Sequence, residues 1–121
     1  MKKIDIGKDF SVDPGGRFFS DKMPSGEEFR EVYLRPCIES LSEDEKVEIT
    51  LDSGVDGYGS SFLVEGFAGM VKYGYISAKD LLEKLEFIYA DQDFEFFEKK
   101  IKKYISEANF NSQSYISTKD K

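Results

Sequence analysis

The sequence of 121 residues contains no histidine and no tryptophan, and it has a single cysteine, Cys37. Without histidine the chain has no imidazole base, no Ser-His or Cys-His pair and no histidine-ligated metal, which excludes most familiar hydrolases. One cysteine can form neither an internal disulfide nor a thiolate zinc site. We therefore expect Cys37 to be a small core residue in a reducing compartment.

Clustered positive charge is also scarce. The chain has 17 basic and 24 acidic residues, a net charge of −7, and its one basic cluster is the group of lysines from Lys99 to Lys103. Binding to a phosphate backbone depends on basic residues gathered on one face, so no nucleic-acid partner is expected. The lysines lie near the end of a predicted helix, where they complement its dipole.

No long hydrophobic run is present. The most apolar stretch, residues 62–71, is half as long as a membrane span and contains Glu65. The sequence therefore predicts a cytoplasmic protein with no membrane partner.

What the sequence does contain is enough apolar material for one core. Hydrophobic residues make up 40% of the chain, and eleven Phe and seven Tyr supply large core side chains. We predict one domain over residues 1–108, followed by a loose C-terminal tail over residues 109–121, in which few apolar residues occur.

The hydrophobic spacing predicts alternating strands and helices. Apolar residues at even positions from Ile4 to Val12 suggest a strand, and the turn residues 13–16 would join it to a return strand, Arg17 to Ser20, in a hairpin. The pattern then predicts a helix that Ser25 caps and that kinks or breaks around Leu34 to Pro36. It further predicts a strand over 46–52, an apolar helix over 60–73, a short helix after Ser77, a strand over 86–90 and a helix over 94–108. This order predicts an α/β fold with a mixed sheet of about four strands and helices packed on it.

The most informative segment is the end of the strand at residue 52, the glycine-rich loop after it, and Ser60 and Ser61 in the first turn of the next helix. A serine at this position is exposed and lies among free backbone N–H groups that tolerate a phosphate. From the residues alone, Ser60 is either a helix cap or a switch.

This segment resembles the STAS domains of anti-sigma-factor antagonists, in which a hydrophobic strand leads to an Asp-Ser-Ser-Gly-Leu turn and an apolar helix. An uncharacterised STAS-like branch is more similar still, over nearly Ile4 to Ile105. The matching motifs are Pro14-Gly15-Gly16-Arg17, Ser25-Gly26-Glu27-Glu28-Phe29-Arg30, Leu34-Arg35-Pro36 and Ser60-Ser61-Phe62-Leu63.

The resemblance implies a non-enzymatic regulatory module that binds a protein partner of the kinase or ATPase type, with phosphorylation of Ser60 as the release signal. The partner-binding residues would be Tyr58, Gly59, Ser60, Ser61 and Phe62. This chain has Gly59 where the family has Asp and Phe62 where it has Gly, so binding is better supported than switching. Neither a cofactor nor a metal is implied.

The apolar residues of the helix over 60–73 cover more of its circumference than one sheet face can bury. We therefore expect Phe62, Phe67 and Met70 to be divided between the core and an exposed strip that a partner could cover. Gly66 and Gly69 lie on one face and would let the helix backbone approach a sheet closely.

Two other interpretations remain open. Arg17 and Arg30 could hold a carboxylate or phosphate, or could form internal ion pairs with Asp21, Glu27 or Glu31. The loop from Gly57 to Ser61 could bind an anion in a small-molecule or nucleotide sensor, although it lacks the lysine of a P-loop. The carboxylates of the chain show no spacing typical of a catalytic pair, so no catalytic residue is predicted.

Overall fold

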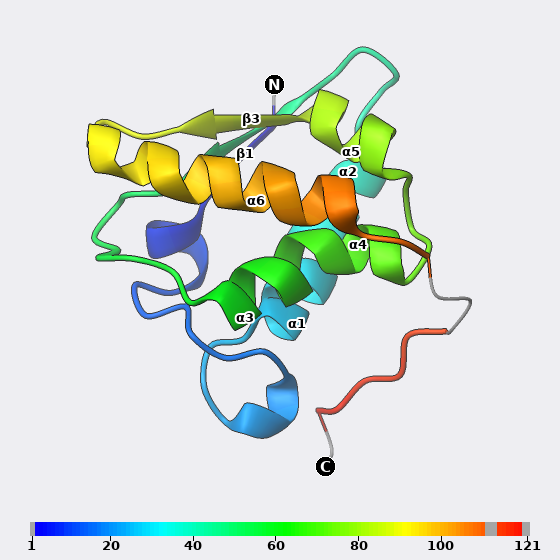
Figure 1. Ribbon diagram of the computed structural model, residues 1–121, viewed down its shortest axis with the longest axis horizontal. Helices are drawn as coiled ribbons and strands as arrows, with labels where there is room; N and C mark the ends of the chain where they lie inside the picture. Colours follow the sequence, from blue (N-terminus) through cyan, green and yellow to red (C-terminus); the bar gives the residue numbers. More distant parts are fainter. Residues whose placement is uncertain (1, 111–113, 120–121) are drawn as a thin grey trace.

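A three-stranded parallel sheet forms one layer of the molecule. The computed structural model describes residues 2–110 and 114–119, and Figure 1 shows the helices on one side of the sheet. The strands are β1 (Lys2–Asp5), β2 (Val47–Thr50) and β3 (Leu85–Ile88), in the order β1-β2-β3. The α/β class is therefore confirmed, whereas the described residues form three parallel strands in place of the expected mixed sheet of about four.

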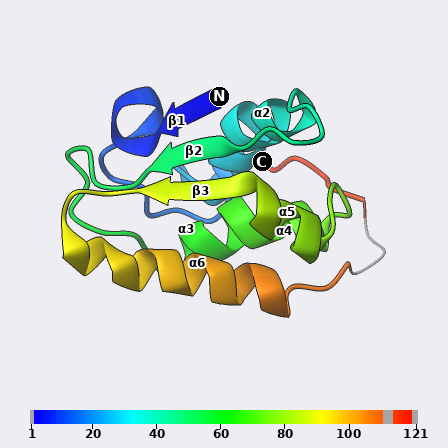
Figure 2. The ribbon, with the colours of Figure 1, turned by 90° about the horizontal axis from the view of Figure 1, so that it is seen from above.

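The two faces of the sheet differ in polarity. Ile49 of β2 pairs with Ile4 on one side and Phe87 on the other, and this row faces the helices. The neighbouring row contains Glu48 and Glu86, and Glu86 is exposed. Figure 2 shows the strands in front of the helices, so none of the helices in the described part of the chain covers the polar face.

The predicted N-terminal hairpin is wrong. β1 ends at Asp5, whose carboxylate accepts a hydrogen bond from the backbone N–H of Lys8, and the chain turns into the π-helical segment Ile6–Phe10. The predicted return strand is replaced by a 3-10 turn, Phe19–Asp21. β1 pairs with β2, in a register that joins residues 45 positions apart, because its apolar residues complete the row that faces the helices.

The first long helical segment starts where the sequence predicts. Ser25 Oγ accepts a hydrogen bond from the backbone N–H of Glu28 at 3.1 Å. The segment then runs through α1 (Gly26–Glu28), a π-helical part (Phe29–Leu34) and α2 (Arg35–Glu39). Leu34 and Arg35 keep right-handed helical angles, so Pro36 marks a change of helix type and not a break.

The second helical segment lies in the middle of the helical layer. It comprises α3 (Ser60–Leu63), a π-helical part (Val64–Ala68) and α4 (Gly69–Lys72), and it contacts both the first segment and α6 (Glu95–Glu107). Phe62, Phe67 and Met70 are all fully buried. The expected exposed apolar strip is therefore wrong, because helices cover this segment on two sides and the sheet covers a third.

The glycines of this segment allow a close approach to another helix, and not to the sheet as expected. A Cβ atom on Gly26 of α1 would lie 2.6 Å from the carbonyl oxygen of Phe62 and 2.7 Å from the backbone nitrogen of Gly66. A Cβ atom on Gly69 would lie 2.5 Å from Nη1 of Arg30. The two segments thus cross with their backbones almost in contact.

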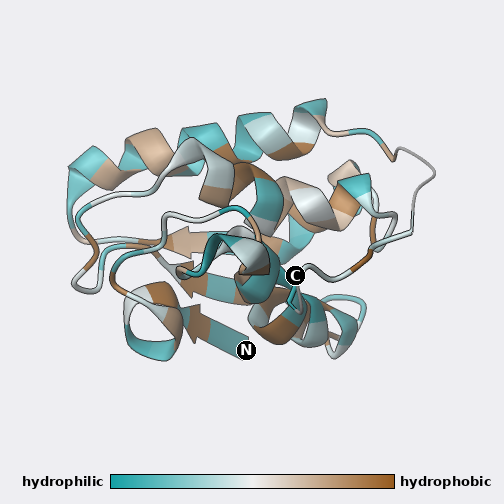
Figure 3. Ribbon diagram, turned by 90° about the horizontal axis from the view of Figure 1, so that it is seen from below, coloured by the Kyte–Doolittle hydropathy of each residue, from teal (hydrophilic) through white to brown (hydrophobic). Residues whose placement is uncertain are grey.

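The remaining elements complete the helical layer. α5 (Ala78–Lys84) is capped by Ser77, whose Oγ accepts from the backbone N–H of Asp80 at 3.1 Å. β3 follows, then the 3-10 turn Gln92–Phe94. α6 buries Ile101 and Ile105, and Figure 3 shows hydrophilic and hydrophobic stretches alternating along this helix. Among the described residues, no helix combines the length and the apolar character that crossing a membrane would require.

Candidate functional site

The loops at the carboxyl ends of the strands are tied together by side chains. Ser53 Oγ donates a hydrogen bond to the carboxylate of Asp5 at 2.7 Å, which joins the loop after β2 to the end of β1. Asp52 accepts from the backbone N–H groups of Ala90 and Asp91 at 2.8 and 2.9 Å, which joins the same loop to the end of β3. The loop that leads to α3 therefore has a defined position at this edge of the sheet.

Tyr58 anchors this loop from inside the protein. Its hydroxyl donates to the carbonyl oxygen of Leu51 at 2.6 Å, and its ring packs against Phe62 and Phe97. Burial, with a smaller effect of the charges of Asp5 and Asp52, raises the pKa of the Tyr58 hydroxyl far above its ordinary value. Tyr58 is thus a neutral core residue under the site.

Gly59, and not Ser60, is the N-cap of α3. Gly59 has extended backbone angles and offers no side-chain cap, and its carbonyl oxygen accepts from the backbone N–H of Leu63. Ser60 is exposed in the first turn of the helix. The cap interpretation of Ser60 is therefore wrong, and its hydroxyl faces solvent at the positive end of the helix.

Two of the five predicted partner-binding residues are not on the surface. Phe62 is fully buried and packs against Phe10 and Phe29, and Tyr58 is only 9% exposed. The Phe62 ring packs against the first helical segment and the Tyr58 ring against α6, so neither ring is available to a partner. Gly59 and Ser60 are exposed and Ser61 is half-buried, so these three residues remain available.

Two basic side chains flank the start of α3. Arg17 Nη2 donates to Ser61 Oγ at 3.3 Å. On the other side, Lys100 of α6 lines a hollow together with Ser60, and its ammonium lies 5.4 Å from the ring centre of Phe96. The first turn of α3 carries no acidic residue, but Asp13 and Asp56 line the hollow that Gly59 also lines, so charges of both signs surround this corner.

Exposed apolar side chains surround the same corner. Val12 and Met23, 48% and 49% exposed, line a hollow of about 480 Å³ that Gly59 also lines. Phe96, 58% exposed, lines the hollow of about 200 Å³ that contains Ser60. We call this region the Ser60 surface; it comprises Val12, Arg17, Met23, Gly59, Ser60, Ser61, Phe96 and Lys100.

The sequence argument missed the apolar part of the Ser60 surface. Phe96 could have been predicted to be exposed from the sequence. The apolar stripe that includes Phe94 and Phe97 leaves Phe96 on another face of α6, so its large ring points away from the core. Val12 and Met23 have no such local signal, because only the folded loops bring them to Gly59.

Arg30 does not form an anion site with Arg17. Its side chain is fully buried, and its Nε and Nη1 atoms pair with carboxylate oxygens of Glu31 and Glu65 at 2.7 Å each. Burial, which alone would lower it, is outweighed by these two carboxylates, and they raise the pKa of Arg30 above its ordinary value. The internal ion-pair interpretation is therefore right for Arg30, with Glu65 as a partner that the sequence did not suggest.

Packing explains the first glycine of the loop from Gly57 to Ser61. A Cβ atom on Gly57 would lie 3.3 Å from the ring of Phe97, closer than most contacts of real Cβ atoms. The glycine therefore lets the loop pass over α6, and it is not by itself a sign of a nucleotide cradle.

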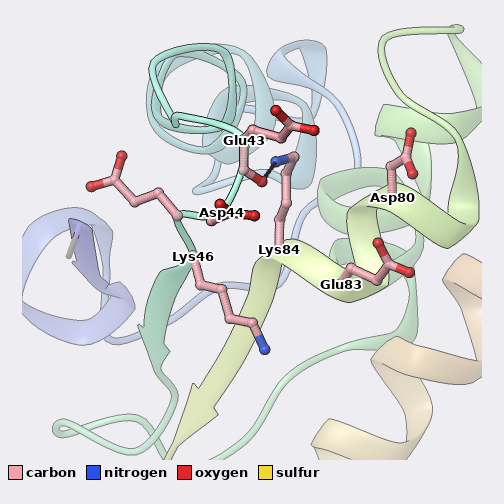
Figure 4. Close-up of a pocket in the computed structure, with 7 residues that line it drawn as sticks. Glu43, Asp44, Lys46, Asp80, Glu83 and Lys84 are labelled. Carbon is pink, nitrogen blue, oxygen red and sulfur yellow. Dashed lines mark hydrogen bonds between the residues drawn. The ribbon is translucent and has the colours of Figure 1, made fainter.

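A third hollow, of about 450 Å³, lies where β2 and β3 begin and is lined mostly by acidic residues. Figure 4 shows the carboxylates of Glu43, Asp80 and Glu83 apart from one another, while Lys84 donates to the carbonyl oxygen of Glu43 at 3.4 Å. Across residues 2–110 and 114–119, no group of three or more Cys, Asp or Glu side chains could hold a metal ion. This hollow is an open, solvated surface.

Comparison of the chain with protein-family models, with curated proteins and with solved structures found no match.

Proposed function

We propose that this protein is a regulatory binding module that engages a protein partner through the Ser60 surface. The observation that carries the proposal is the position of three large exposed apolar side chains, Val12, Met23 and Phe96, on both sides of the exposed Ser60. Apolar groups that gather around a polar centre are typical of protein interfaces, with aromatic residues contributing most of the binding energy. Phe96 is the residue that we expect to bind most strongly.

The polar centre of this surface suits a charge switch. Phosphate on Ser60 would lie at an uncapped helix start, between Arg17 and Lys100, so the fold would accept the charge. The same charge would have to lose water inside an interface, which disfavours partner binding. The resemblance to STAS domains suggests a kinase-type ATPase as the partner, and that identity is part of the proposal.

Site-specific photo-crosslinking in the cells from which the protein comes tests this surface. A photoreactive residue replaces Phe96 in the full chain, and the matched control replaces Val32, which is 53% exposed on the first helical segment. We expect one protein to be captured from position 96 and not from position 32. In the Ser60→Asp background the adduct should decrease, whereas Ser106→Asp should leave it unchanged. Equal capture from both positions would contradict the proposal.

A small-molecule or nucleotide sensor is the second candidate, because Arg17 lies beside Ser61 at the same helix start. A thermal-shift screen of phosphate and nucleotides against the whole chain separates the two candidates. A ligand present at about 100 times its dissociation constant adds roughly 2.7 kcal/mol of stability. A shift that Arg17→Ala removes, while crosslinking from position 96 captures no protein, would favour the sensor.

A further inference from the structure

The carboxylate of Glu27 is buried, and a remote part of the chain supplies most of its hydrogen bonds. Its Oε1 accepts from the backbone N–H of Phe19 at 2.9 Å and from the Thr118 hydroxyl at 2.6 Å. Its Oε2 accepts from the backbone N–H of Thr118 at 2.9 Å and from the Tyr115 hydroxyl. Three of these four donors belong to residues 114–119 of the predicted loose tail.

The neighbouring guanidinium of Arg30 is less well satisfied. Nε and Nη1 donate to Glu31 and Glu65, but buried Nη2 has no acceptor among the described residues. The Arg30 Cζ atom lies 4.9 Å from the ring centre of Tyr115 and 4.7 Å from that of Tyr73. The C-terminal segment therefore covers the guanidinium group with an aromatic ring and gives Nη2 no hydrogen-bond acceptor.

The segment contacts the domain through two side chains separated by two residues. Tyr115 and Thr118 point inward, and Thr118 Oγ1 also accepts from the backbone N–H of Ser20 at 3.0 Å. Between them, Ile116 is 75% exposed and Ser117 is also exposed. Figure 1 shows this segment, in red, as a chain without helix or strand that ends beside the loop containing Phe19–Asp21.

We propose that the covered surface formed by Glu27, Arg30 and Tyr73, which we call the Glu27 patch, is a binding site for an extended peptide segment of a partner with hydroxyl side chains in the spacing Tyr-x-x-Thr, and that residues 114–119 occupy it as a displaceable internal ligand. Glu27 requires hydroxyl and N–H donors, and the internal segment shows the spacing that supplies them. The segment leaves Nη2 of Arg30 without an acceptor, so it is not the best ligand for the Glu27 patch. A partner segment that also offers a carbonyl oxygen to Nη2 would compete with it.

This site is separate from the Ser60 surface, so the two proposals can fail independently.

The first measurement is amide hydrogen exchange and ¹⁵N relaxation of the full chain by NMR. We expect the amide of residue 118 to be protected in the unmodified chain, and its protection factor, corrected for the intrinsic rate of each residue type, to fall about tenfold or more in the double variant Tyr115→Phe, Thr118→Val. Ile116→Ala, which changes an outward-facing side chain of the same segment, should leave the protection intact. A mobile, unprotected segment in the unmodified chain would overturn the proposal.

The second measurement tests binding from outside the chain. The peptide Ser-Tyr-Ile-Ser-Thr-Lys, which copies residues 114–119, is added to the full-length double variant, whose own segment is released. We expect saturable shifts of the Phe19 and Glu27 amide signals, and no shifts with the peptide in which Phe and Val replace Tyr and Thr. Equal responses to both peptides, or no response, would overturn the proposal. So would a dimer that exchanges this segment between copies, because its occupant would be a second copy and not a partner peptide.

Discussion

Two helical segments of this protein begin with a serine and a glycine, and the two starts have opposite properties. At the first start, Ser25 is fully buried and caps the backbone N–H of Glu28. At the second start, Gly59 takes the cap position without a side-chain hydrogen bond, and Ser60 is exposed. The comparison shows that the order of the two residues decides which serine is structural and which is free for binding.

Charge separates the two starts further. Glu27 and Glu28 lie in the first turn of the first segment, where they offset the positive end of the helix dipole. The first turn of α3 has no acidic residue, and Arg17 and Lys100 lie beside it. The first start therefore has acidic side chains at the positive end of its helix dipole, whereas the second has none within its own first turn.

One loop touches both starts. The backbone N–H of Phe19 donates to Glu27, and the side chain of Arg17 donates to Ser61. Phe19 thus contacts the Glu27 patch that the C-terminal segment covers, and Arg17 contacts the Ser60 surface. Variants can show how independently the two starts behave.

The largest effect on the free energy of unfolding is expected at the interface between the first and second helical segments. Glu65→Ala leaves Arg30 buried without one of its two carboxylate partners, so we expect the free energy of unfolding to fall by about 3–5 kcal/mol. Lys99→Ala, which breaks the exposed ion pair with Glu95, should change it by less than about 1 kcal/mol. Urea unfolding followed by circular dichroism measures both, and similar losses would contradict the buried role of the Arg30–Glu65 pair.

Glu27 should produce a smaller and pH-dependent effect. Burial alone would raise the pKa of Glu27, but hydrogen bonds from Thr118, Tyr115 and Phe19 outweigh it and lower the pKa below its ordinary value. A lowered folded-state pKa means that this stabilisation is present at neutral pH and is lost as the pH falls below the ordinary glutamate pKa and through the folded-state value.

Glu27→Gln should therefore cost about 2 kcal/mol at neutral pH, and the difference from the unmodified chain should shrink toward pH 3. Urea unfolding at a series of pH values provides the measurement. Glu86→Gln, on the open face of the sheet, is the control and should stay within about 0.5 kcal/mol throughout. A Glu27→Gln difference that grows toward acid would show that the hydrogen bonds do not favour the ionised carboxylate.

The two serines give a direct comparison of the two starts. Ser25→Ala should lower the free energy of unfolding by about 1 kcal/mol, because it removes the cap from Glu28 N–H. Ser60→Ala should change it by less than about 0.5 kcal/mol, because Gly59 is the cap residue. Equal losses in thermal or urea unfolding would mean that Ser60 is a structural residue after all.

The sequence predicted the parts of the fold that local patterns control. The cap at Ser25, the alternation around Ile49 and the apolar stripe of α6 each gave an element close to its observed place. The predicted N-terminal strand is longer than the observed one, which ends at Asp5. Ile6 and Phe10 fit both the even spacing of a strand and the i, i+4 spacing of a helical turn, so the pattern alone does not separate the two.

The candidate site was predictable only where its features depend on neighbouring residues in the sequence. Ser60 at the start of a helix followed from the sequence, but the burial of Phe62 depends on a helix crossing that no local pattern reveals. The contacts of Thr118 with Glu27 join residues 91 positions apart, so no local pattern in residues 109–121 could predict them. Long-range packing decided which residues near Ser60 are available to a partner.

The smallest expected effect tests the positive potential at the second start. Ser60→Asp places a carboxylate at the uncapped start of α3, near Arg17 and Lys100, so we expect a gain of about 0.3–1 kcal/mol in the free energy of unfolding. The gain should decrease at high salt, because the groups involved are exposed and ions screen them.

Ser106→Asp is the control on an exposed serine near the carboxyl end of α6, and its effect is taken relative to Ser106→Asn, because either change removes the hydrogen bond from Ser106 Oγ to the carbonyl oxygen of Lys103. There the added charge faces the negative end of the helix dipole, so we expect a loss of similar size. Urea unfolding of both variants at low and high salt shows whether the two effects have opposite signs and converge when screened. If Ser60→Asp destabilises the protein as Ser106→Asp does, the helix start is not a favourable place for a negative charge. Phosphorylation of Ser60 would then oppose folding as well as binding, and the separation of the structural start from the switchable start would be lost.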